Sequence, residues 1–181
     1  GVSMEYPMIA NDGINSDPDV HNAIVVHELF HNYTPFFIGF NETQFGWMDE
    51  GWAEFLENKF RGDDFSLYEQ IDLPGYTDKA GTLSDYPVIT AEAGMSFSSF
   101  VFLYLEKPCI ALLLLEELMG EEPFAQATRE FMTEWNGKHP SPYDFFYTFG
   151  RFANEDINWF WKACYFEYGY ADLAIKSVDK N

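Results

Sequence analysis

The residues of this chain best suited to chemistry lie in one short segment, His27-Glu28-Leu29-Phe30-His31. On a helix, residues four positions apart lie one above the other, so the imidazoles of His27 and His31 can bind a single metal ion. Glu28 follows the first histidine, and its carboxylate therefore lies beside such an ion rather than on it. We predict that His27 and His31 are metal ligands and that Glu28 is a general base acting on a bound water molecule.

A third ligand is needed from elsewhere in the chain, because a catalytic zinc site has three protein ligands and one open position. Glu50 follows His31 by nineteen positions, and an antiparallel return of the next helix would bring it back to the same ion. We therefore predict one Zn²⁺ ion held by His27, His31 and Glu50, which lowers the pKa of bound water toward ~7. The alternative is a pair of ordinary histidines, and it is weaker because unpaired buried histidines are costly.

Two helices are expected to position these ligands. The first starts near Asp17, which is followed by a proline, and runs to about Tyr33, before Pro35 stops it. The second follows Asp49, which we interpret as its N-cap, and runs to about Phe60. Both assignments place the ligands on neighbouring helices.

Two further acidic residues lie on the second helix, Glu54 and Glu57, four and seven positions after Glu50. Glu54 is a candidate for orienting a ligand histidine. A solvent-facing helix surface is the interpretation we favour for both residues.

The remaining segments of the sequence predict a mainly α fold with short strands at the chain ends. Residues 1–9 are expected to be extended and 11–18 to form turns, while 62–95 is rich in Gly, Pro, Asp and Thr and predicts a long irregular loop. The tail 170–178 alternates like a strand. Further helices are expected over 100–119 and 121–135, and from 141 and 155 onward.

The composition limits the class of protein and its partners. The chain has 181 residues, enough for one domain, and 47% apolar residues, which excludes a disordered segment. A net charge of -20 repels phosphate backbones and anionic lipids, so we expect neither nucleic acid nor membrane as a partner. The longest apolar run, 110–115, is too short to span a bilayer. Cys109 and Cys164 are expected in the core, with a disulfide between them left open.

A family resemblance supports the metal site. HExxH followed by Trp47-Met48-Asp49-Glu50-Gly51-Trp52-Ala53-Glu54 resembles the gluzincin aminopeptidases, the family of aminopeptidase N and leukotriene hydrolase. Gly1-Val2-Ser3-Met4-Glu5-Tyr6-Pro7 resembles that family's G-x-M-E-N strand, with Tyr6 where Asn is usual. Segments 105–124, 138–146 and 159–160 are also similar. The resemblance implies that Glu5 binds the free α-amino group of a peptide substrate.

The resemblance also implies a fold and a reaction. The fold would be the helical part of a thermolysin-like catalytic domain, a single domain over residues 1–181 that belongs to a longer protein and contacts its other domains. The reaction would be the removal of N-terminal residues from peptides by zinc-activated water. The alternatives are an endo- or oligopeptidase, a hydrolase of another small substrate, and a catalytically silent module that keeps zinc or binds peptide ends.

One departure from the family concerns its catalytic tyrosine, which lies in a Y-x-K-G or Y-x-K-P setting. Aligning Lys107-Pro108 places Leu105 at the tyrosine position, with Tyr104 one residue earlier. One helical step rotates a side chain by about 100°, so Tyr104 can reach the cleft only if the helix is locally irregular. We take Tyr104 as the candidate oxyanion donor, with a core aromatic as the equal alternative and Tyr76 and Tyr86 as lesser candidates.

Overall fold

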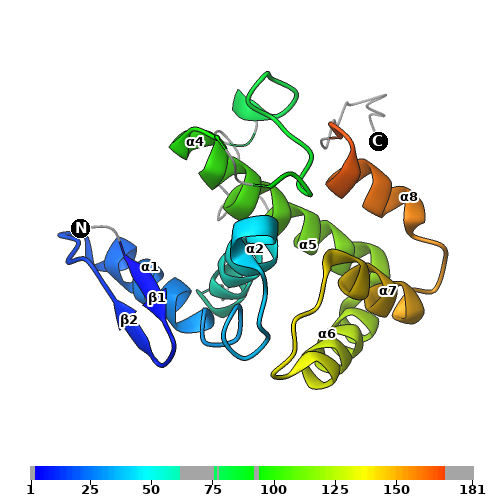
Figure 1. The fold of residues 1–181 in the computed structure, drawn as a ribbon, viewed down its shortest axis with the longest axis horizontal. Coiled ribbons are helices and arrows are strands. Elements are labelled where there is room, and N and C mark those ends of the chain that lie inside the picture. Colours follow the sequence, from blue (N-terminus) through cyan, green and yellow to red (C-terminus); the bar gives the residue numbers. More distant parts are fainter. Residues whose placement is uncertain (1–2, 62–75, 77, 92–93, 170–181) are drawn as a thin grey trace, which may run out of the picture.

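The computed structural model describes residues 3–61, 76, 78–91 and 94–169. It confirms a mainly helical fold with a short two-stranded hairpin (Figure 1). The strand expected over 170–178 lies outside the described residues. The elements are β1 (Met4–Tyr6), β2 (Ile9–Asn11), α1 (Pro18–Phe30), α2 (Glu42–Arg61), α4 (Phe97–Phe100), η1 (Val101–Glu106), α5 (Lys107–Met119), α6 (Glu121–Trp135), α7 (Pro142–Phe152), α8 (Asn158–Trp161) and η2 (Lys162–Phe166).

The N-terminal segment turns back on itself earlier than expected. Strands β1 and β2 pair antiparallel with Glu5 opposite Ala10, so residues 1–9 do not form one extended stretch. The chain reverses at Pro7 and Met8, and Met8 adopts a positive φ of 65°. The hairpin contacts α1, which brings β1 beside the helix that carries the HExxH motif.

Helix α1 begins where the sequence predicts. The Asp17 side chain accepts hydrogen bonds from the backbone N–H groups of Asp19 and Val20 at 3.0 and 3.5 Å, and Pro18 takes the first helical position. The helix ends at Phe30, and the chain then forms turns as far as residue 37.

Helix α2 begins well before the predicted start. The side chain of Asn41 accepts a hydrogen bond from the N–H of Gln44 at 3.2 Å, and the helix runs from Glu42 to Arg61 with a kink at Phe45. Asp49 therefore lies inside the helix and cannot be its N-cap. Because α2 starts earlier than predicted, Asp49 does not cap the helix. Its side chain is buried and can contact residues of the predicted site.

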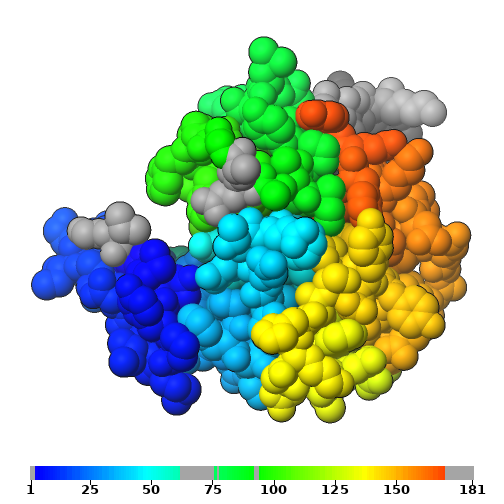
Figure 2. Space-filling model, in the orientation of Figure 1, coloured from blue at the N-terminus to red at the C-terminus, as the bar shows by residue number. Residues whose placement is uncertain are grey.

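Helix α2 has two different faces. Trp47 and Trp52 are fully buried, and both contact Phe145 of α7 edge-on at 5.5 and 5.9 Å between ring centroids. Figure 2 shows α2 between the N-terminal segment on one side and the α6–α7 region on the other. The aromatic residues fix α2 in the core, while Glu50, Glu54 and Glu57 of the same helix line a cleft.

Elements α4, η1 and α5 form one continuous helical run from Phe97 to Met119. In the described part of the chain, this run alone is long and apolar enough to cross a membrane by length and composition, with a mean hydropathy of 1.6. Of its 18-residue apolar stretch, 67% is buried inside the protein, and the run packs along α2 (Figure 1). We interpret it as the core helix of the domain.

The two long helices approach closely because two glycines of α2 face the run. A Cβ on Gly46 would lie 2.8 Å from the ring of Tyr104, and one on Gly51 would lie 2.7 Å from the ring of Pro108. Neither distance is compatible with a side chain unless the helices move apart. The distance between α2 and the run therefore depends on these two positions.

We expect Gly51→Ala to lower the free energy of unfolding by about 1–3 kcal/mol, the usual cost of overpacking, since the Pro108 ring cannot rotate away. Gly150→Ala in α7 is the matched control, because a Cβ there meets nothing within 4 Å. It should be neutral or stabilising by up to ~1 kcal/mol. Urea unfolding of both variants measures the difference. An equal midpoint for Gly51→Ala and the parent would show that the helices are not in tight contact.

Candidate metal and catalytic site

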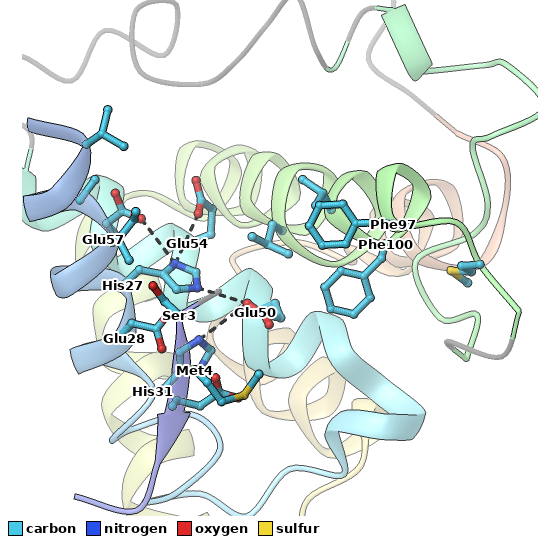
Figure 3. A pocket seen from close by; sticks show the side chains of 17 residues that line it. Ser3, Met4, His27, Glu28, His31, Glu50, Glu54, Glu57, Phe97 and Phe100 are labelled. Atoms are coloured by element: carbon cyan, nitrogen blue, oxygen red, sulfur yellow. Dashed lines mark hydrogen bonds and ion pairs between the residues drawn. The ribbon is translucent and has the colours of Figure 1, made fainter. Parts of the chain in front are cut away.

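The structure brings the three predicted metal ligands together. Nε2 of His27 lies 3.2 Å from Oε2 of Glu50, and Nε2 of His31 lies 3.7 Å from the same oxygen (Figure 3). Two donors that are each about 2.0–2.1 Å from a tetrahedral zinc ion lie roughly 3.4 Å apart. The two distances to Glu50 lie on either side of this value, and ligand atoms of all three residues lie within 4.8 Å of one another, so the group could hold one zinc ion.

The other ring nitrogen of each histidine faces an acidic side chain. Nδ1 of His31 donates to Oδ1 of Asp49 at 2.8 Å and lies 2.9 Å from the carbonyl oxygen of Thr34. Nδ1 of His27 lies 3.4 Å from Glu57 and 3.5 Å from Glu54. Histidines that bind metals are commonly held in this way, with the second nitrogen hydrogen-bonded to a carboxylate or carbonyl. Both rings are thus oriented with Nε2 toward Glu50.

Three of these supporting residues were assigned other roles from the sequence. Asp49 was interpreted as a helix cap, and Glu54 and Glu57 as a solvent-facing surface. The spacing of residues 50, 54 and 57 on one helix face could have identified the two glutamates from the predicted helix alone, whereas Asp49 becomes available because α2 begins before it. Arg61 holds Glu57 at 2.7 Å, and Asn58 holds Glu54 at 3.1 Å.

The charges around the histidines favour a cation. Burial alone would lower the pKa of His27, but hydrogen bonds with Glu50, Glu54 and Glu57 outweigh it and raise that pKa well above the usual value. Burial likewise opposes the charged form of His31, whose pKa is nevertheless raised, chiefly by Asp49. For Glu50, burial is outweighed by the two histidines, and its pKa is lowered. Positive charge is stabilised here, whether carried by a proton or by a metal ion.

The surroundings of the Glu28 side chain suit a general base. Its side chain is buried, and among the described residues its Oε2 has no hydrogen-bond partner. Burial raises the pKa of Glu28, although His27 and His31 act in the opposite direction. A carboxylate with a raised pKa accepts a proton more readily. Glu28 lines the same cavity as the three ligands, a cleft of about 800 Å³.

Glu5 reaches this cleft from the hairpin. It lies on β1 and lines the cavity together with Ser3 and Met4. One of its carboxylate oxygens lies within 4.8 Å of a ligand atom of His31 and of one on Asp49. The antiparallel turn at Pro7 thus places a carboxylate in the lining of the cleft that contains the predicted ligands.

Tyr104 does not lie where we predicted. Its ring is fully buried against Gly46, and its hydroxyl donates to the carbonyl oxygen of Thr90 at 2.9 Å. Leu105 lines the cleft instead. The helix is irregular here, since η1 is a π-helical segment in which the N–H of Lys107 bonds to the carbonyl of Phe102. The phenol nevertheless lies in the core beside Gly46, so the expectation of a hydroxyl facing the predicted zinc position is wrong.

The other two tyrosine candidates do not line the cleft either. Tyr76 is buried against Phe102, with ring centroids 5.7 Å apart, and lines a separate cavity. Tyr86 is partly exposed, and its backbone carbonyl accepts a hydrogen bond from Lys107. Within the ranges that the structure describes, the lining of the cleft contains no tyrosine.

Asp49→Ala should weaken zinc binding by about 10- to 100-fold, because His31 loses the carboxylate that orients its ring. Asp49→Asn is the matched control: its amide oxygen can still accept from Nδ1 of His31, so a smaller loss is expected. Titration against a chelator of known affinity measures both constants. Equal zinc affinity for Asp49→Ala and the parent would show that Asp49 does not support the metal site.

Comparisons with known proteins agree with this geometry. Residues 6–164 match the model of the peptidase family M1 domain, a range that includes the three ligands and Glu28. The chain is 27% identical over 165 residues to a protein named leucine aminopeptidase 2 from Aspergillus fumigatus, covering 84% of this chain and 26% of that protein. It is 25% identical over 169 residues to leucine aminopeptidase 2 from Aspergillus oryzae, covering 85% and 27%.

The chain spans about a quarter of the length of these two relatives. No solved structure matches it significantly. The family match nevertheless covers most of the chain and begins one residue after Glu5. On this match, the chain belongs to peptidase family M1.

Proposed function

We propose that this chain forms the catalytic centre of a zinc-dependent aminopeptidase, which releases N-terminal residues from peptides. The observation that carries the proposal is the convergence of His27, His31 and Glu50, with a carboxylate oxygen of Glu28 in the same cleft that has no hydrogen-bond partner among the described residues. Membership of a peptidase family and the names of the two relatives support the same class of reaction.

His27, His31 and Glu50 would hold the metal, and Asp49 would keep one of the imidazoles in place. A zinc ion bound by such ligands supplies a Lewis acid that polarises a carbonyl and acidifies water. Glu28 accepts the proton of the attacking water and passes it to the leaving amine. Its raised pKa suits this double role, since a stronger base takes the proton more readily.

Glu5 supports cleavage at a free N-terminus. A carboxylate at the edge of the cleft attracts the ammonium group of a peptide and forms a charge-assisted hydrogen bond with it. Binding the ammonium there places the first peptide bond, rather than an internal one, beside Glu28. An endopeptidase or oligopeptidase would not need this carboxylate.

A catalytically silent module that binds peptide ends is the second candidate. The observation that favours it is the position of Tyr104, whose hydroxyl is bound to Thr90 while Leu105 faces the cleft. A hydrogen-bond donor to the oxyanion typically raises turnover by about 10²–10³. Among the described residues, no tyrosine lines the cleft to act as this donor. The two candidates differ in whether the zinc-loaded protein turns over peptides at all.

Glu28→Gln should retain stoichiometric zinc and lose nearly all turnover, because an amide of the same size cannot take the proton of water. Hydrolysis is followed on a peptide with a free N-terminus and on its N-acetylated counterpart, with zinc content measured on each sample. We expect the parent to cleave only the free peptide. A variant as fast as the parent would exclude Glu28 as the base, and a zinc-loaded parent without activity would favour the silent module.

A further inference from the structure

The hairpin of β1 and β2, which carries Glu5, has little buried surface of its own. Four of residues 3–13 are partly buried and the others are exposed; the partly buried ones are Ser3, Glu5, Asp12 and Gly13. Large apolar side chains of both strands are among the exposed residues. Burial of apolar surface therefore contributes little to holding the hairpin against the described part of the chain. The proposed function nevertheless requires the Glu5 carboxylate at a defined place in the cleft.

The side chain of Asp12 is bonded across the hairpin to the start of β1. The hydroxyl of Ser3 donates to Oδ1 of Asp12 at 2.9 Å. Met4 is paired with Asn11, so Ser3 and Asp12 form the next pair along the two strands. This hydrogen bond therefore extends the hairpin by one position and fixes β1 two residues before Glu5.

The second carboxylate oxygen of Asp12 faces helix α1, beside which the hairpin lies (Figure 1). Oδ2 of Asp12 lies 3.8 Å from Nδ1 of His21, near the start of that helix. This distance is an electrostatic contact and is longer than a hydrogen bond. Both atoms are buried, and among the described residues neither has a hydrogen-bond partner. One carboxylate thus joins β1, through Ser3, to the helix that carries the HExxH motif.

We infer that Ser3, Asp12 and His21 form a latch that holds the hairpin on α1 and thereby positions Glu5 for the ammonium group of the substrate. This inference rests on the proposed function, because it takes Glu5 as the group that binds the ammonium. Neither Asp12 nor His21 is in the described lining of the cleft, so both are positioning residues that act through the hairpin. The competing explanation is that the latch only stabilises the fold.

The test compares two zinc-binding compounds that differ only in the amino group. Leucine hydroxamate has a free α-amine, and 4-methylpentanoic hydroxamate lacks it. Zinc content is determined first, and both affinities are then measured by calorimetry on the zinc-loaded protein. The ratio of the two affinities measures what the ammonium group contributes. The parent should bind the amine compound about 10- to 100-fold more tightly, as expected for one hydrogen bond between charged groups, and Glu5→Gln should reduce this ratio.

His21→Ala should reduce the same ratio several-fold, while zinc content and the affinity for the compound without an amine stay unchanged. The His21 side chain is 35% exposed, so its replacement spares the core. His21→Asn should restore most of the ratio, because the amide nitrogen of Asn takes the place of Nδ1 and can donate to Asp12. In the Glu5→Gln background, His21→Ala should cause no further loss, since both changes act on the same contact.

Asp17→Ala is the matched control for a general effect on α1. It removes the side chain that caps the same helix, and no hydrogen bond or ion pair joins Asp17 to the latch in the described part of the chain. The midpoint of urea unfolding should fall in this variant, and the ratio of the two affinities should stay that of the parent.

The possible failures are distinguishable. An unchanged ratio in His21→Ala, an equal loss for both compounds, no recovery in His21→Asn, or a further loss in the Glu5→Gln background would each overturn this inference and leave the proposed function intact. A parent ratio that Glu5→Gln does not reduce would overturn the role proposed for Glu5, and this inference with it. A protein that takes up no zinc would overturn the proposed function as a whole.

Discussion

The hydrogen bond between His31 and Asp49 is the interaction on which the site depends. It joins the end of α1 to the interior of α2, and both side chains are almost completely buried, at 1% and 2% exposed. Because Nδ1 of His31 is engaged with Asp49 and the Thr34 carbonyl, Nε2 must face Glu50. Leaving either buried group unpaired costs about 1–3 kcal/mol. The same bond thus stabilises the helix pair and fixes the geometry of a metal ligand.

Helix α2 couples this site to the rest of the fold. Trp47 and Trp52 are buried among the aromatic residues of α7, and Glu50, Glu54 and Glu57 line the cleft on another face of the same helix. The glycines of α2 let it approach the long helical run, whose first turns line the cleft. A shift of α2 would therefore move Glu50 relative to His27 and His31, and would also change the width of the cleft.

The sequence was sufficient to predict the mainly helical fold and the convergence of His27, His31 and Glu50, because the two histidines are four positions apart on one helix face and zinc chemistry calls for a third donor from elsewhere. It was not sufficient for Asp49, since the start of α2 was placed by a local capping rule although Asn41 supplies the cap. Tyr104 was misplaced for a different reason. Its selection assumed a local irregularity that would turn the phenol toward the cleft; the π-helical turn is present, but the ring packs against Gly46 and Leu105 lines the cleft.

The central claim is that His27, His31 and Glu50 bind one zinc ion. X-ray absorption spectroscopy of the zinc-loaded protein tests it directly, because imidazole ligands give a distinct scattering pattern. The structure predicts two imidazole nitrogens, with carboxylate or water oxygens completing the shell, at about 2.0–2.1 Å. His31→Ala should remove one imidazole from that shell. A zinc environment with no imidazole, or one unchanged by His31→Ala, would contradict the account.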